Sequence, residues 1–167
     1  LYMERVYYLK KQMVIKFYLK TTQLQWVKTL HLRMREHSAN GQKVAEHLSK
    51  HSMVERVAYP GTSSGLPKER ADKYLSDGCG GLLGFEIKGG HEAGKKFINS
   101  LEMLYHVANI GDSRSLAIHP ASTTHSQLNE EELASGGISS GYIRLSIGLE
   151  HIDDILADID QALAKAE

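Results

Sequence analysis

The stretch Tyr142-Ile143-Arg144-Leu145-Ser146-Ile147-Gly148 decides the fold class, because every second residue in its middle is a large apolar one. This alternation predicts a β-strand with two unlike faces. The isoleucine and leucine side chains share the face that we expect in the core. Arg144 and Ser146 share the opposite face, where a charged and a polar group need other partners.

Outward from this strand, helical and strand-like patterns alternate over short connections. Asn129 followed by Glu132 predicts a capping box that starts a short helix, and Gly136-Gly137 predicts its end. Asn40-Gly41 predicts a bend within a long first helix. We therefore expect an α+β domain, with a mixed or antiparallel sheet covered by helices. The other expected helices cover residues 24–48, 69–75, 92–101 and 152–166, and the other strands residues 54–59, 80–87, 104–110 and 115–118.

The charge balance argues against a nucleic-acid or membrane partner, since 20 basic and 20 acidic residues cancel over the 167 residues. No apolar run is long enough to cross a bilayer. The single cysteine, Cys79, excludes an internal disulfide and fits a reducing, cytoplasmic location. Residues 1–20 differ from the rest, because five basic residues stand against Glu4 alone and five aromatic residues accompany them. This segment is either an RNA- or membrane-contacting arm or a misfit end, and we favour the second interpretation.

Three familiar kinds of site find little support. His31 and His37, like His119 and His125, are six residues apart, which suits metal binding poorly, so we expect no metal site. No Gly-x-Ser-x-Gly sequence indicates a serine hydrolase. Lys88-Gly89-Gly90-His91 resembles part of a phosphate loop, but a solvated turn between a strand and a helix explains it better.

Two features do indicate a site. Residues 108–126 crowd polar and glycine residues around a short apolar strand, which is costly unless the polar groups meet a ligand or one another. Arg144 lies on an otherwise apolar strand. Its guanidinium either pairs with a carboxylate of the chain or receives one from a substrate, and the residues alone leave both open.

Several segments, in order and spacing, resemble the pyridoxal-phosphate-dependent enzymes of Cys/Met metabolism, the cystathionine γ-synthase group. The resemblance implies that residues 23–167 form the C-terminal small domain of a fold-type I enzyme, like that of aspartate aminotransferase. Residues 1–22 do not match, and we expect a truncated or frame-shifted coding sequence, or an internal start. The segments are Leu30-His31-Leu32-Arg33-Met34, His37-Ser38-Ala39-Asn40, the 108–126 loop, Glu130-Glu131-Glu132-Leu133 and residues 143–150.

Site residues follow from the resemblance position by position. It implies that Arg144 forms a bidentate salt bridge with the α-carboxylate of an amino-acid substrate, that Ser115 contacts the same carboxylate, and that Asn109 lines the substrate pocket. Thr124 and His125 match a structural pair, and the basic Arg114 favours members that act on O-acetylhomoserine over those that handle cystathionine. The lysine that binds pyridoxal 5′-phosphate belongs to the family's large domain, so no catalytic or cofactor-binding residue is expected in this chain.

The implied activity is γ-replacement, in which O-acetylhomoserine and sulfide or methanethiol give homocysteine or methionine. Without the large domain, we expect no turnover from this chain alone. The alternatives are a fragment of a methionine γ-lyase or of a cystathionine γ-synthase or lyase, and a freestanding regulatory module that pairs with a separate large domain. The resemblance also implies a homo-oligomer for full-length members. A protein that binds metal through its histidines is a third hypothesis, with less support than the other two.

Overall fold

The computed structural model describes residues 21–167, so the predictions for residues 1–20 lie outside the described residues. The chain divides into two compact units, one up to Arg33 and one from Met34 to Glu167. In the first unit, residues 21–28 are helical and a turn follows at Thr29. Within the described residues, no helix is both long and apolar enough to cross a membrane.

The predicted first helix is interrupted at Thr29 rather than bent at Asn40-Gly41. The Thr29 hydroxyl donates to the carbonyl of Gln25, and the Arg33 guanidinium donates to the carbonyl of Trp26 at 2.9 Å. These bonds occupy the backbone where the helix breaks. Helix α2 then runs without interruption from Leu30 to Leu48, through the predicted bend.

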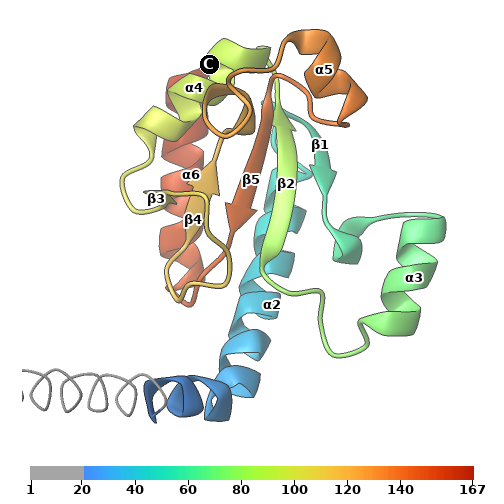
Figure 1. The fold of residues 1–167 in the computed structure, drawn as a ribbon, viewed down its shortest axis with the longest axis vertical. Coiled ribbons are helices and arrows are strands. Elements are labelled where there is room, and N and C mark those ends of the chain that lie inside the picture. Colours follow the sequence, from blue (N-terminus) through green and yellow to red (C-terminus); the bar gives the residue numbers. More distant parts are fainter. Residues whose placement is uncertain (1–20) are drawn as a thin grey trace, which may run out of the picture. The chain divides into compact units, whose positions relative to one another are not determined.

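The predicted mixed sheet is confirmed, and its five strands lie in the order β1-β2-β5-β4-β3 (Figure 1). The pairs β1–β2, β2–β5 and β5–β4 are antiparallel, whereas β3 and β4 are parallel. The two strands expected over 104–110 and 115–118 are shorter than predicted, since β3 covers only two residues and β4 only three. The strands are β1 Val54–Ala58, β2 Leu82–Ile87, β3 Tyr105–His106, β4 Leu116–Ile118 and β5 Tyr142–Ser146.

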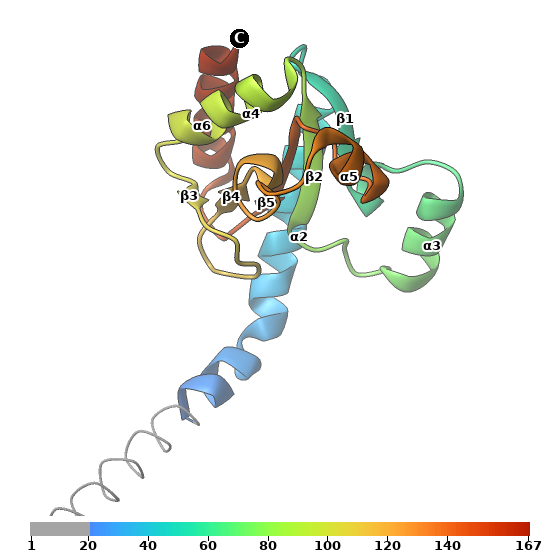
Figure 2. The same ribbon diagram turned by 45° about the horizontal axis from the view of Figure 1, so that its top comes forward.

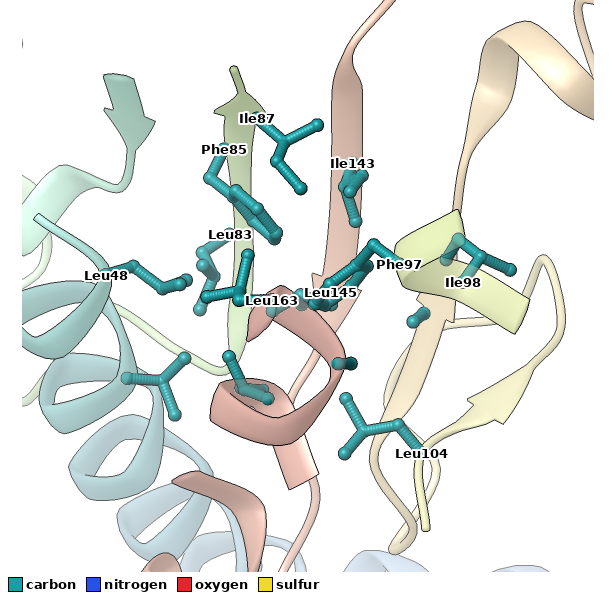
Figure 3. Packing of buried hydrophobic residues seen from close by; sticks show 14 of the residues in the cluster. Leu48, Leu83, Phe85, Ile87, Phe97, Ile98, Leu104, Ile143, Leu145 and Leu163 are labelled. Atoms are coloured by element: carbon teal, nitrogen blue, oxygen red, sulfur yellow. The ribbon is translucent and has the colours of Figure 1, made fainter. Parts of the chain in front are cut away.

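Three helices cover one face of this sheet: the second half of α2, α4 (Gly90–Ser100) and α6 (Ile152–Ala166). Figure 3 shows their side chains meeting those of β2 and β5 in one core. Phe85 of β2 and Phe97 of α4 are fully buried and pack edge to face, with ring centroids 5.5 Å apart. The alternation that predicted β5 is confirmed, since Ile143 and Leu145 are fully buried.

The remaining helices lie outside this layer. Helix α3 (Leu66–Tyr74) begins three residues before the predicted start and stands beyond the β1 edge in both views (Figure 1 and Figure 2). Helix α5 (Glu130–Ser135) has the predicted capping box, in which Asn129 Oδ1 accepts from the Glu132 N–H and a Glu132 carboxylate oxygen accepts from the Asn129 N–H. Two single-turn 3₁₀ helices cover Pro60–Thr62 and Pro120–Ser122. The uncovered face of β5 carries Arg144.

Candidate functional site

Arg144 lies at the centre of β5, on the face turned away from the core. Its Cα pairs with Gly84 of β2 on one side and Ile118 of β4 on the other. The side chain is half-buried, and its Nη2 donates to the carbonyl of Asn109 at 3.3 Å. Among residues 21–167, no carboxylate forms an ion pair with Arg144. Of the two alternatives left open by the sequence, an internal carboxylate partner therefore has no support in the described chain.

Asn109 belongs to a loop, residues 109–115, that lies against the polar face of β5. The exposed Asn109 side chain accepts a hydrogen bond from the N–H of Ile110. Gly111, with φ of +74°, turns the chain so that its N–H donates to Ser146 Oγ at 3.1 Å. The structure thus brings Asn109 and Arg144 together, and Ser146 helps to hold the loop there. Their shared role in a substrate site stays a prediction.

Ser115 is fully buried at the other end of this loop. Its N–H and its hydroxyl donate to the two carboxylate oxygens of Glu150, at 2.6 and 2.9 Å. The hydroxyl oxygen also accepts from the N–H of Gly148 at 2.8 Å. Both donors of Ser115 are therefore used within the chain, and its predicted contact with a substrate carboxylate stays a prediction.

Two buried polar side chains of α2 fix the segment after β5. His37 Nδ1 lies 2.6 Å from the carbonyl oxygen of Ile147, which can only accept, so Nδ1 carries the proton. Asn40 Nδ2 donates to the carbonyls of Gly148 and Glu150 at 3.2 and 3.1 Å. These contacts explain why the helix continues through Asn40-Gly41. The asparagine faces partners in the segment after β5, and a Cβ on Gly41 would lie 2.6 Å from the carbonyl oxygen of Gly80.

A cleft of about 380 Å³ adjoins the Arg144 side of the sheet. Gly111 and Ser146 line it, so it shares residues with the contact that holds the loop on β5. Its wall also includes the exposed apolar side chains of Met34, Leu82 and Ile110, together with the partly buried Cys79. Arg144 does not line the cleft itself, but it shares a face of β5 with Ser146, two residues further on. The geometry therefore offers a cation next to a mostly apolar recess, which suits an anionic group with an aliphatic extension.

Other predicted residues lie outside this contact. Arg114 is exposed, with its guanidinium 4.4 Å from the ring centre of Tyr105 and its Nε 3.5 Å from Asp112 Oδ1. The side chains of Thr124 and His125 form a hydrogen bond between Oγ1 and Nδ1 at 2.8 Å. Lys88 is exposed in the turn between β2 and α4, as predicted, and its Nζ donates to the carbonyl of Ser52.

One further histidine pair needs to be considered besides the two pairs that are six residues apart. His47 and His51 are four residues apart, which is a spacing that metal sites on helices use. In the structure, His47 Nε2 contacts Asp160 Oδ1 at 2.6 Å instead. Within the described part of the chain, no three histidine, cysteine or acidic side chains are grouped to hold a metal ion.

Comparison with known proteins gives a consistent result. The family model for "Cys/Met metabolism PLP-dependent enzyme" matches residues 18–164. An O-acetyl-L-homoserine sulfhydrylase of Leptospira meyeri is 56% identical over 141 residues, which is 84% of this chain and 32% of the relative. An L-methionine gamma-lyase of Pseudomonas putida is 47% identical over 140 residues, 84% of this chain and 35% of the relative.

A solved structure shares the fold as well. The crystal structure of a Campylobacter jejuni protein assigned as O-acetylhomoserine (thiol)-lyase, with N′-pyridoxyl-lysine-5′-monophosphate, has a TM-score of 0.78 and 45% identity. The match covers 84% of this chain and 34% of that one. The chain thus spans about a third of the length of the relatives that it matches.

Proposed function

Since the chain belongs to the Cys/Met metabolism PLP-dependent enzyme family, we propose that it supplies the substrate-carboxylate half of a γ-replacement site that acts on O-acetylhomoserine. The second substrate would be sulfide or methanethiol, and the product homocysteine or methionine. The observation that carries this proposal is the half-buried Arg144, which has no carboxylate partner among residues 21–167 and lies beside the cleft at the 109–115 loop.

Arg144 suits a carboxylate because its planar guanidinium offers parallel N–H donors to both oxygens. One Nη2 proton already goes to the carbonyl of Asn109, which fixes the plane of the fork. Among residues 21–167, no other hydrogen-bond partner occupies the remaining donors of Arg144, which can therefore receive the α-carboxylate of an amino acid. The adjoining apolar recess, with Met34, Leu82 and Ile110 in its wall, would take the aliphatic part of the substrate.

Pyridoxal 5′-phosphate is the cofactor of the family, and it serves as the electron sink for such reactions. The cleft beside Arg144 has no lysine among its lining residues. The lining of this cleft therefore does not fit the cofactor's covalent attachment site, and we place that site in the part of the enzyme that this chain does not span. We further propose that the chain alone has no turnover, and that full-length relatives form homo-oligomers through the part that this chain does not span.

Two other functions keep some support. An L-methionine gamma-lyase is 47% identical, so γ-elimination from methionine is the alternative reaction, although the sulfhydrylase of Leptospira meyeri is closer at 56%. A freestanding small domain that pairs with a separate large domain is the second. Exposed apolar side chains in residues 24–32 favour a protein partner, with Trp26 and Val27 about two-thirds exposed.

The direct test is an NMR titration of the ¹⁵N-labelled chain with O-acetyl-L-homoserine and, separately, with L-methionine. We expect saturable shifts at the Arg144 Nε–H and at the Gly111 amide, with a Kd in the millimolar range. Arg144→Gln should abolish them, and Arg144→Lys should weaken binding because a point charge replaces the fork. Equal binding by the wild type and Arg144→Gln would refute the assignment.

Turnover is tested in the same preparation. With pyridoxal 5′-phosphate, O-acetyl-L-homoserine and sulfide added, we expect no homocysteine from the chain alone. Homocysteine formation by the purified chain would overturn this part of the proposal. Addition of a separately expressed large domain distinguishes the module: restored activity supports pairing, and failure to associate argues against it.

A further inference from the structure

We infer that Glu150 is a positioning residue for the carboxylate site, and that it acts by holding the 109–115 loop in the place where Asn109 orients Arg144. This inference rests on the proposed function, because it names what keeps that site in shape. Glu150 follows β5 and does not itself contact Arg144. Its two carboxylate oxygens instead accept the N–H and the hydroxyl of Ser115, the last residue of the loop.

The loop and the Glu150 segment interlock along their length. The N–H of Leu149 donates to the carbonyl of Ser113 at 2.8 Å, and the N–H of Gly148 donates to Ser115 Oγ at 2.8 Å. A Cβ on Gly148 would lie 2.4 Å from both Glu150 Oε2 and the Ser113 carbonyl oxygen. Only glycine allows so close an approach, which shows that the two segments are fitted to each other through the Glu150 carboxylate.

Helix α2 holds the Glu150 segment from the other side. Asn40 donates to the backbone carbonyl of Glu150, and His37 donates to that of Ile147. Both side chains are at least 95% buried, so these bonds do not compete with bulk water. The 109–115 loop is thus tied to a rigid helix by way of Glu150. At its other end, the bond from Gly111 to Ser146 ties it to β5.

Loss of the Glu150 carboxylate would act first on Ser115. Its backbone N–H is fully buried and would lose its acceptor, which is costly, and the loop would shift to find another one. Such a shift moves the carbonyl of Asn109, which now fixes the plane of the Arg144 guanidinium. Displacement of an orienting group by about 1 Å is enough to weaken bidentate recognition strongly.

The test compares Glu150→Gln, Glu150→Ala and Ser115→Ala with the wild type, with Glu55→Gln as the control. Glu55 is exposed on β1, so the control makes the same carboxylate-to-amide change away from the site. Each variant is titrated with O-acetyl-L-homoserine as in the test of Arg144. Amide hydrogen exchange at Gly111 and Ser115 is measured without ligand, and Tm is measured by calorimetry.

We expect Glu150→Ala to raise the Kd by about tenfold or more, which corresponds to about 1.4 kcal/mol, and to speed exchange at both amides. Glu150→Gln keeps one acceptor and should fall between Glu150→Ala and the wild type, while Glu55→Gln should stay within about twofold. A Kd that is unchanged in Glu150→Ala, even with a lower Tm, would show a purely structural role and overturn the inference. If Arg144→Gln binds O-acetyl-L-homoserine as well as the wild type, the proposed function fails, and this inference fails with it. That result differs from an unchanged Kd in Glu150→Ala alone, which overturns only this inference.

Discussion

Asp158 offers the sharpest test of how this domain is held together. It lies on the buried side of α6, and its carboxylate accepts the backbone N–H groups of Glu102, Met103 and Leu104 at 2.8, 2.9 and 2.9 Å. The side chain of Gln161 donates to it as well. These bonds fix the turn by which the chain leaves α4 for β3. We predict that replacement of Asp158 destabilises the fold more than any exposed carboxylate does.

The size of the effect follows from the count of donors. Asp158→Asn keeps the shape but has one acceptor oxygen, so two of the four donors face an NH₂ group. Buried donors without acceptors cost about 1–3 kcal/mol each, and only Leu104 among the three backbone donors is itself buried. We therefore expect about 3 kcal/mol for Asp158→Asn, and more for Asp158→Ala. For a chain of this size, 3 kcal/mol lowers Tm by about 6–12 °C.

The pH dependence provides an independent check. Burial raises the pKa of the Asp158 carboxyl, but the hydrogen bonds from Leu104, Glu102 and Met103 together lower it by more than burial raises it. The pKa therefore lies below the usual 3.8. A carboxyl with a lowered folded-state pKa stabilises the protein above its unfolded-state pKa and loses that contribution as the pH falls through the folded-state value. The difference in unfolding free energy between wild type and Asp158→Asn should be full at pH 6 and shrink below pH of about 4.

The assay is urea denaturation followed by circular dichroism at several pH values, with Asp77→Asn as the control at an exposed loop position. The control should change the unfolding free energy by less than about 0.5 kcal/mol. An Asp158→Asn protein as stable as the control at pH 6 would refute the reasoning, since it would mean that the four bonds contribute nothing net.

Three further predictions use the same assay. Gly94→Ala should destabilise α4 by about 1–3 kcal/mol, although alanine favours helices, because its Cβ would lie 2.6 Å from Nε2 of the fully buried His119; a gain in stability would contradict the packing. Burial lowers the pKa of His119 below 6.5, and the nearby His91 and His106 lower it too, although the hydrogen bond to the Ser140 carbonyl raises it. Because the folded state keeps this imidazole neutral, the unfolding free energy should fall as the pH drops below about 6.5. His119→Gln should flatten the dependence of the unfolding free energy on pH in that range, and an unchanged slope would exclude His119 as its source. Asn129→Ala should lower the unfolding free energy by about 1 kcal/mol, because it removes the capping box of α5. An equal loss in Glu132→Ala would identify the two reciprocal hydrogen bonds as the cause. No loss of stability in either variant would argue against them.

Local patterns predicted most of the secondary structure. The alternation in β5, the helical period of α6 and the capping box of α5 each lie within one segment, so the residues that form the element also reveal it. The long first helix was only partly predictable. A glycine after an asparagine suggests a bend, yet here the two residues serve contacts with the Gly80 and Gly148 backbone, which a local pattern cannot show.

The candidate site was predicted by residue type more than by arrangement. Arg144 is conspicuous as a cation on an apolar strand, and the polar 108–126 loop is conspicuous by composition. The partners of Ser115 were not predicted, because Glu150 lies 35 residues away and no local pattern shows which residue its carboxylate meets. Asp158 carried a signal that could have been found, namely an acidic residue on the apolar face of an amphipathic helix.

The sequence by itself determined the fold class, the order of the elements and the face on which Arg144 lies, because side-chain periodicity follows directly from backbone geometry. Only the tertiary structure decided which donors meet which acceptors: Asn109 with Arg144, Ser115 with Glu150, and three backbone N–H groups with Asp158. Hydrogen bonds require an approach within about 3 Å and a defined angle. Such an approach between distant segments exists only after the sheet and its helices have packed.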